Sequence, residues 1–119
     1  NLETKKTLIR NGLKALIKKW FPKESSETCA VLEAVLFGFL SEQAKGTMSH
    51  VKLSTDKFAQ HPLPYACEEA GLDSKRLPTN QEVIFNFIDE KVTIKPLNGA
   101  IEILHSMHET APAAFARSD

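Results

Sequence analysis

The most hydrophobic stretch of the chain runs from Cys29 to Leu40, reads CAVLEAVLFGFL, and contains a single charged residue, Glu33. On a helix of about 3.6 residues per turn, its apolar side chains point in nearly every direction, a pattern typical of a helix buried on all sides. The stretch is too short to span a bilayer, which takes about 20 residues. We therefore expect it to form the middle of a helix over about 26–45, at the centre of a globular core.

The residues before this stretch have the periodicity of an amphipathic helix over 2–21. Its apolar face consists of Leu2, Ile9, Leu13, Leu16 and Trp20. Pro22 should end the helix, because proline disfavours a helical backbone in the residue before it. Ser25 and Ser26 can cap the next helix, and the short connection predicts that the two helices pack as a hairpin.

Two further helices are predicted in the second half of the chain. Residues 79–82 (TNQE) match a capping box and predict a helix over 80–90. Asn98 can cap a last helix over 99–109. Both would pack around the central apolar helix.

Two short stretches, 50–53 and 91–95, alternate apolar and polar residues and predict a two-stranded β pair. Together these signals predict a mostly α fold: a compact bundle of four to five helices around the central helix (about 26–45), with this short β pair. A chain of 119 residues fits one domain. The helical domain would cover 1–109, and 110–119 would form a flexible C-terminal tail.

Charge is distributed unevenly, although the 15 basic and 15 acidic residues balance. Residues 1–23 hold seven basic residues and one acidic residue, so the rest of the chain has a net charge of −6. The candidate interaction residues lie on the first helix: Lys6, Arg10, Lys14, Lys18, Lys19 and Trp20. Their cationic stripe suits an acidic protein surface or a phosphate backbone. A basic helix on an acidic body also predicts self-association. A membrane is the least expected partner, because the apolar face of this helix is needed to pack on the central helix.

Residues 66–77 (ACEEAGLDSKRL) resemble the helix-turn-helix segment of many bacterial regulators. Gly71 stands where that motif makes its left-handed turn. The resemblance implies nucleic-acid binding, assisted by Lys75 and Arg76. Pro78 falls where the recognition helix of the motif would continue.

Few patterns in the sequence point to a metal site or to acid–base chemistry. Glu102 and His105 have the E-x-x-H spacing of bundle di-metal sites, but no second pair is present, and we expect no metal and no cofactor. Glu33 and His108 are the candidates for polar groups in the core. A buried Glu33 would need a partner, either His108 or a lysine of the first helix, whereas a Glu33 at a solvent-exposed edge would need none.

The chain contains no glycine-rich phosphate loop, no nucleophile elbow and no paired metal-binding cysteines, so we expect no enzyme. Two cysteines without a disulfide framework, and first residues without a signal-peptide pattern, predict a cytoplasmic protein. The favoured function is a small non-enzymatic regulatory or adaptor domain that acts through protein–protein contacts. The alternative is a nucleic-acid-binding regulator that uses the basic first helix and residues 66–77.

Overall fold

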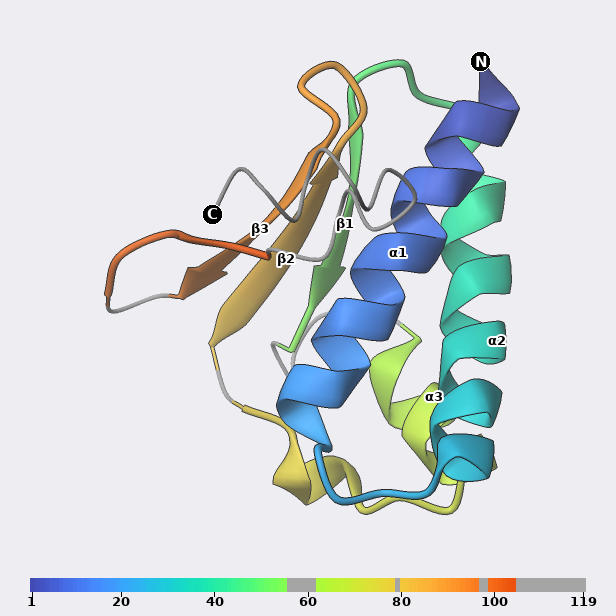
Figure 1. Ribbon diagram of the computed structural model, residues 1–119, viewed down its shortest axis with the longest axis vertical. Helices are drawn as coiled ribbons and strands as arrows, with labels where there is room; N and C mark the ends of the chain where they lie inside the picture. The colour runs from blue at the N-terminus through green and yellow to red at the C-terminus, as the bar shows by residue number, and fades with distance from the viewer. Residues whose placement is uncertain (56–61, 79, 97–98, 105–119) are drawn as a thin grey trace, which may run out of the picture.

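The computed structural model describes residues 1–55, 62–78, 80–96 and 99–104. In chain order the elements are α1 (Leu2–Trp20), α2 (Ser26–Ala44), β1 (His50–Ser54), α3 (Leu63–Glu69), the 3-10 turn η1 (Ser74–Arg76), β2 (Gln81–Asn86), β3 (Lys91–Pro96) and β4 (Glu102–Ile103). The two long helices lie antiparallel, and α1 packs over one face of a four-stranded antiparallel sheet (Figure 1). None of the described helices is both long and apolar enough to cross a membrane.

Local signals set the ends of α1. The side chain of Asn1 caps its first turn by accepting a hydrogen bond from the backbone N–H of Thr4 at 2.9 Å. Glu3 in the first turn and two lysines in the last turn complement the helix dipole. The helix ends at Trp20, two residues before Pro22, as the sequence predicts.

The second helix is capped at both ends, once by a serine and once by a lysine from α1. The Ser25 hydroxyl accepts a hydrogen bond from the backbone N–H of Thr28 at 3.1 Å. At the other end, Nζ of Lys5 donates to the carbonyl oxygen of Ala44, the last residue of α2, at 3.3 Å and to that of Thr47, three residues after it, at 2.7 Å. Because the last carbonyls of a helix have no partner within it, the bond to Ala44 satisfies one of them, and Lys5 ties the start of α1 to the end of α2.

The sheet is a meander in the order β1-β2-β3-β4. Alternate residues of its first three strands are buried on the helix side: Val51, Leu53, Val83, Phe85, Val92 and Ile94. They pair across the strands, with Val51 opposite Phe85 and Phe85 opposite Val92. One face of the sheet therefore belongs to the core, and the other carries mainly polar side chains.

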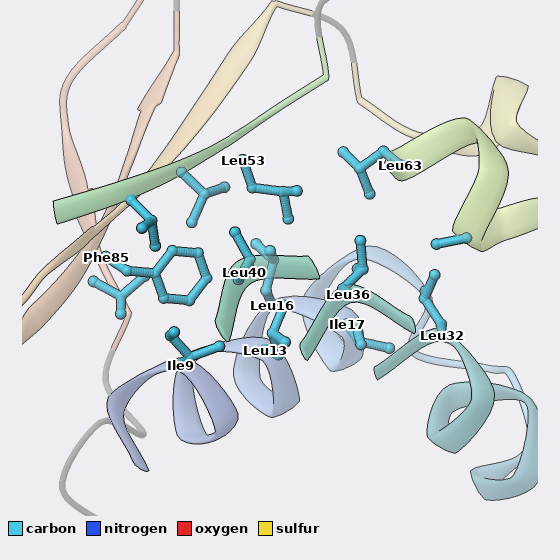
Figure 2. Packing of buried hydrophobic residues seen from close by; sticks show 14 of the residues in the cluster. Ile9, Leu13, Leu16, Ile17, Leu32, Leu36, Leu40, Leu53, Leu63 and Phe85 are labelled. Carbon is cyan, nitrogen blue, oxygen red and sulfur yellow. The ribbon is translucent and has the colours of Figure 1, made fainter. Parts of the chain in front are cut away.

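Leucine and isoleucine side chains of α1 and α2 meet one another and the sheet in the core (Figure 2). Helix α1 and the sheet approach each other closely at Gly12. A Cβ atom there would lie 2.8 Å from the ring of Phe85 and 2.9 Å from a methyl group of Val92, both fully buried. Gly12 is thus the point at which α1 can rest on strands β2 and β3.

The prediction of a mostly α bundle is wrong, because the described residues fold into three α-helices and a four-stranded sheet. Residues 80–90, predicted as a helix, form β2 and the turn after it. Asn80 has a φ of 57°, which is incompatible with starting a helix. In β2 only the two-residue period of a strand places both Val83 and Phe85 on the core side.

The other predicted segments of the second half are also corrected in part. Residues 50–53 and 91–95 are strands as predicted, but β2 lies between them, so they do not pair with each other. The predicted helix over 99–109 is wrong where it can be compared, because Glu102 and Ile103 form β4. Its remaining residues, and the predicted tail 110–119, lie outside the described residues.

The prediction that the helix over 26–45 is buried on all sides is wrong. α2 packs against α1, α3 and β1. Leu32, Leu36 and Leu40 form its buried side. The opposite side of the helix, although almost as apolar, faces solvent.

Candidate protein-interaction surface

Two parallel rows of residues run along the exposed side of α2, each with a spacing of four residues. One row contains Glu27, Val31, Val35 and Phe39, and the neighbouring row contains Ala30, Ala34, Gly38 and Glu42; we call these eight residues the α2 outer face. Val31 is 42% exposed and Phe39 is 39% exposed. Because residues four apart are neighbours on a helix, each row is a continuous line along its surface.

The two rows differ in height. Val31 and Phe39 project from this side of the helix, Val35 between them is half-buried and packs against the core, and Ala30, Ala34 and Gly38 beside them carry only a methyl group or no side chain. A Cβ atom added at Gly38 would meet no atom within 4 Å. The glycine therefore does not serve packing within the described part of the chain, in contrast to Gly12.

The α2 outer face has a carboxylate at each end, and one of the two, Glu42, has a lysine beside it. Glu27 lies in the first turn of α2 and Glu42 in the last, and the helix contains no lysine or arginine. A hydrogen bond from Lys45, at 2.8 Å, lowers the pKa of the Glu42 carboxyl group. The face is consequently apolar in the middle, with Glu27 at one end and the Glu42–Lys45 ion pair at the other.

Two of the predicted interaction residues of α1 contact α2 instead of standing free. The guanidinium group of Arg10 lies 4.5 Å from the centre of the Phe37 ring. Nζ of Lys14 lies 3.4 Å from Oε1 of Glu33, whose side chain is 21% exposed. Glu33 is therefore half-buried and has a lysine of the first helix as its partner.

The remaining predicted interaction residues of α1 lie in different surroundings. Lys18 is exposed and Lys6 is half-buried. Lys19 pairs with Glu102 of β4 at 3.0 Å. Trp20 packs against the core, and its indole nitrogen is buried with no hydrogen-bond partner among the described residues. Binding by these residues therefore stays a prediction, with Lys14 and Lys19 each paired to a carboxylate within the chain.

The weak metal candidates are only partly within the described residues. Glu102 is an exposed residue engaged with Lys19, whereas His105 and His108 lie outside the described residues. Across 1–55, 62–78, 80–96 and 99–104, no group of three or more histidine, cysteine, aspartate or glutamate residues is arranged to hold a metal ion.

The segment 66–77 does not form a helix-turn-helix. α3 ends before Gly71, which has the expected left-handed φ of 75°. The three-residue turn η1 then follows in place of a recognition helix, and β2 begins at Gln81. Arg76 reaches the connection between α1 and α2, where it pairs with Glu24 at 2.7 Å and its guanidinium group lies 5.1 Å from the centre of the Phe21 ring.

A second exposed apolar patch lies at the end of the sheet near the start of α1. Met48 is 81% exposed and Ile88 is 72% exposed. Their neighbours Ser49 and Phe87 are joined by a backbone hydrogen bond of 2.8 Å, which brings the two segments side by side. Neither this patch nor the α2 outer face was predicted from the sequence, although the small residues at 30, 34 and 38 distinguish one side of α2 from the other.

The whole arrangement, a helical hairpin on a four-stranded meander, can be compared with solved structures. It superimposes on the BTG/Tob domain of FOG-3 from C. elegans with a TM-score of 0.65, covering 83% of this chain and 88% of that chain at 16% sequence identity. The fold is similar to that of a BTG/Tob domain. No family model and no curated protein matches the sequence itself.

The likeness to the BTG/Tob domain concerns the fold, because 16% identity carries no information on individual residues. It supports the correction from a helical bundle to a domain with a sheet. The α2 outer face is a property of this sequence and is argued from its own residues.

Proposed function

We propose that the protein is a small regulatory or adaptor domain, without catalytic activity, that binds another protein through the α2 outer face. The observation that carries this proposal is the exposure of Val31 and Phe39 on one side of α2, with the small residues Ala30, Ala34 and Gly38 beside them. Contiguous apolar surface on a folded domain commonly marks an interaction site, and aromatic residues are enriched among the residues that dominate binding.

The structural likeness is consistent with this proposal. The BTG/Tob domain belongs to a family of regulatory protein-interaction domains. The charge of α2 is also compatible with a protein partner, since acidic residues flank the apolar surface and can contribute specificity at its rim.

The proposal is tested by affinity capture from native lysate after nuclease treatment, comparing the wild type with Gly38→Glu. The space above Gly38 is open, so the glutamate should be tolerated by the fold while it places a charge in the centre of the α2 outer face. Thr7→Glu adds the same charge at an exposed position of α1 and is the matched control.

Proteins retained by the wild type and by Thr7→Glu, but lost from Gly38→Glu, would support the proposal. If all three baits retain the same proteins, the α2 outer face is not the binding surface. Circular dichroism of the three purified proteins checks that each is folded.

Nucleic-acid binding by the first helix remains a prediction from the sequence. Lys14 and Lys19 each have a carboxylate partner within the chain, which reduces the charge available for phosphate groups. A filter-binding assay at low salt tests it, because backbone contacts weaken steeply as salt is raised. If the wild type retains DNA or RNA on the filter and a Lys14→Glu, Lys18→Glu variant does not, the result would support this alternative.

A further inference from the structure

A cleft of about 480 Å³ lies between α3 and the start of η1. α3 ends in a left-handed turn at Gly71, closed by a hydrogen bond of 2.8 Å from the backbone N–H of Leu72 to the carbonyl oxygen of Cys67. This turn brings the following residues back beside the helix. One wall of the cleft is therefore formed by α3 and the other by the start of η1: Pro64, Tyr65 and Glu68 on the first, Leu72, Asp73 and Ser74 on the second.

The residues that line the cleft include two carboxylates and no cation. The whole segment 63–74 contains Glu68, Glu69 and Asp73 but neither lysine nor arginine. Neither Glu68 nor Asp73 forms an ion pair within the described part of the chain. The backbone N–H of Lys75 donates to Oδ1 of Asp73 at 2.9 Å, which fixes the position of this carboxylate and occupies only one of its oxygens.

An aromatic ring stands open to solvent in the same cleft. Tyr65 is 58% exposed and lies three positions before Glu68, so the two side chains are neighbours on the surface of α3. The face of an aromatic ring attracts cations, and a planar guanidinium group can stack on it while donating hydrogen bonds to carboxylates. Pro64 and Leu72 add apolar surface that suits the methylene groups of an arginine side chain.

The protein holds one of its own arginines by the same combination of groups. The guanidinium group of Arg76 bonds the carboxylate of Glu24 at 2.7 Å and lies 5.1 Å from the centre of the Phe21 ring. At Tyr65 and Glu68 a ring and a carboxylate are again side by side, but no arginine of the described residues lines that cleft. The cleft therefore has the groups that bind arginine in this fold and lacks the arginine.

We infer that the cleft binds an arginine side chain of a partner protein, with the guanidinium group stacked on Tyr65 and hydrogen-bonded to Glu68 and Asp73. The cleft shares no residue with the α2 outer face, so the inference does not depend on the proposed function. Lysine should bind less well, because its compact ammonium group cannot stack on a ring. The described arginines of the chain, Arg10 and Arg76, each lie over a ring within it, so a second copy is not the expected occupant.

The test is an NMR titration of the ¹⁵N-labelled protein with N-acetyl-arginine-N-methylamide, a blocked arginine without terminal charges. The corresponding blocked lysine and blocked glutamine are titrated at the same pH and chloride concentration. A single side chain at an exposed site binds weakly, so we expect a dissociation constant on the order of 1 to 10 mM for arginine. The amide shifts should saturate and should centre on residues 64–74. They should be weaker with lysine and absent with glutamine.

Variants of the lining residues assign the binding to the cleft. Tyr65→Leu should weaken arginine binding about twofold to fivefold through loss of the ring. Glu68→Gln and Asp73→Asn should each weaken it by about the same factor through loss of a charge. Asparagine at 73 can still accept the hydrogen bond from Lys75, so the turn is kept. Glu69→Gln removes the same charge from the next residue of α3, which does not line the cleft, and should leave the affinity nearly unchanged.

Shifts that are absent, or that are as large for lysine or glutamine as for arginine, would overturn the inference. An equal loss of affinity in Glu69→Gln and Glu68→Gln would overturn it as well, because binding would then follow the net charge of α3 and not the cleft. A dimer in sedimentation velocity that is lost in Tyr65→Leu would assign the cleft to a second copy, against the inference. Gly38→Glu should leave the titration unchanged, so this result and the lysate capture that tests the proposed function fail separately.

Discussion

Alanine at Gly12 and alanine at Gly38 should change the stability of the free protein in different directions. Both glycines lie inside α-helices, so the intrinsic helix propensity favours alanine by about 1 kcal/mol at each position. At Gly38 the added methyl group meets nothing within 4 Å, and Gly38→Ala should therefore be more stable by about 0.5 to 1 kcal/mol.

At Gly12 the same methyl group would lie 2.8 Å from the Phe85 ring and 2.9 Å from Val92. Both neighbours are fully buried, so they can move only by disturbing the packing of the sheet. Overpacking of this kind costs about 1 to 3 kcal/mol, which offsets or exceeds the gain in helix propensity. Gly12→Ala should thus lie between unchanged and about 2 kcal/mol less stable.

Urea unfolding followed by circular dichroism measures both free energies under one set of conditions. The difference between the two variants should be about 1 to 3 kcal/mol, whatever the exact propensity of the host helix. Phe85→Leu should reduce the penalty of Gly12→Ala in a double-mutant cycle, because the shortest contact is removed. Equal stabilisation by the two alanines would refute the close approach of α1 to the sheet.

Three further predictions concern caps and a buried thiol. Lys5→Met should cost about 1.5 to 3 kcal/mol in urea unfolding, because the ammonium group bonds two carbonyls at the end of α2, whereas Lys18→Met should cost almost nothing. Ser25→Ala should cost about 0.5 to 2 kcal/mol through loss of the N-cap, with Ser26→Ala as the control that keeps it. Burial raises the pKa of the Cys67 thiol, so the folded state binds its proton more tightly than the unfolded state does. Its contribution to stability should be complete below the ordinary thiol pKa of about 8.5 and should decline as pH rises above it, a decline that is smaller in Cys67→Ala.

The two long helices could be predicted almost to the residue, because the signals that end them are local. Pro22 and the Ser25 cap act within one or two turns and need no information on the rest of the fold. The strand after Asn80 could not be predicted in the same way. Its apolar residues satisfy a helical and a strand period about equally, and pairing with β1 and β3 on both sides selects the strand.

In the candidate site, too, some features follow from the sequence alone and others only from the tertiary structure. The sequence by itself determined that α2 is apolar in every direction, with acidic residues near its ends and small residues along one row. Which direction faces the core was decided by the tertiary structure, because α1, α3 and β1 pack against one side only. Burial depends on contacts between residues far apart in the chain. The sequence of a helix that is apolar on every side has no period that indicates which side makes these contacts. The exposure of Val31 and Phe39 therefore became visible only once the chain was folded.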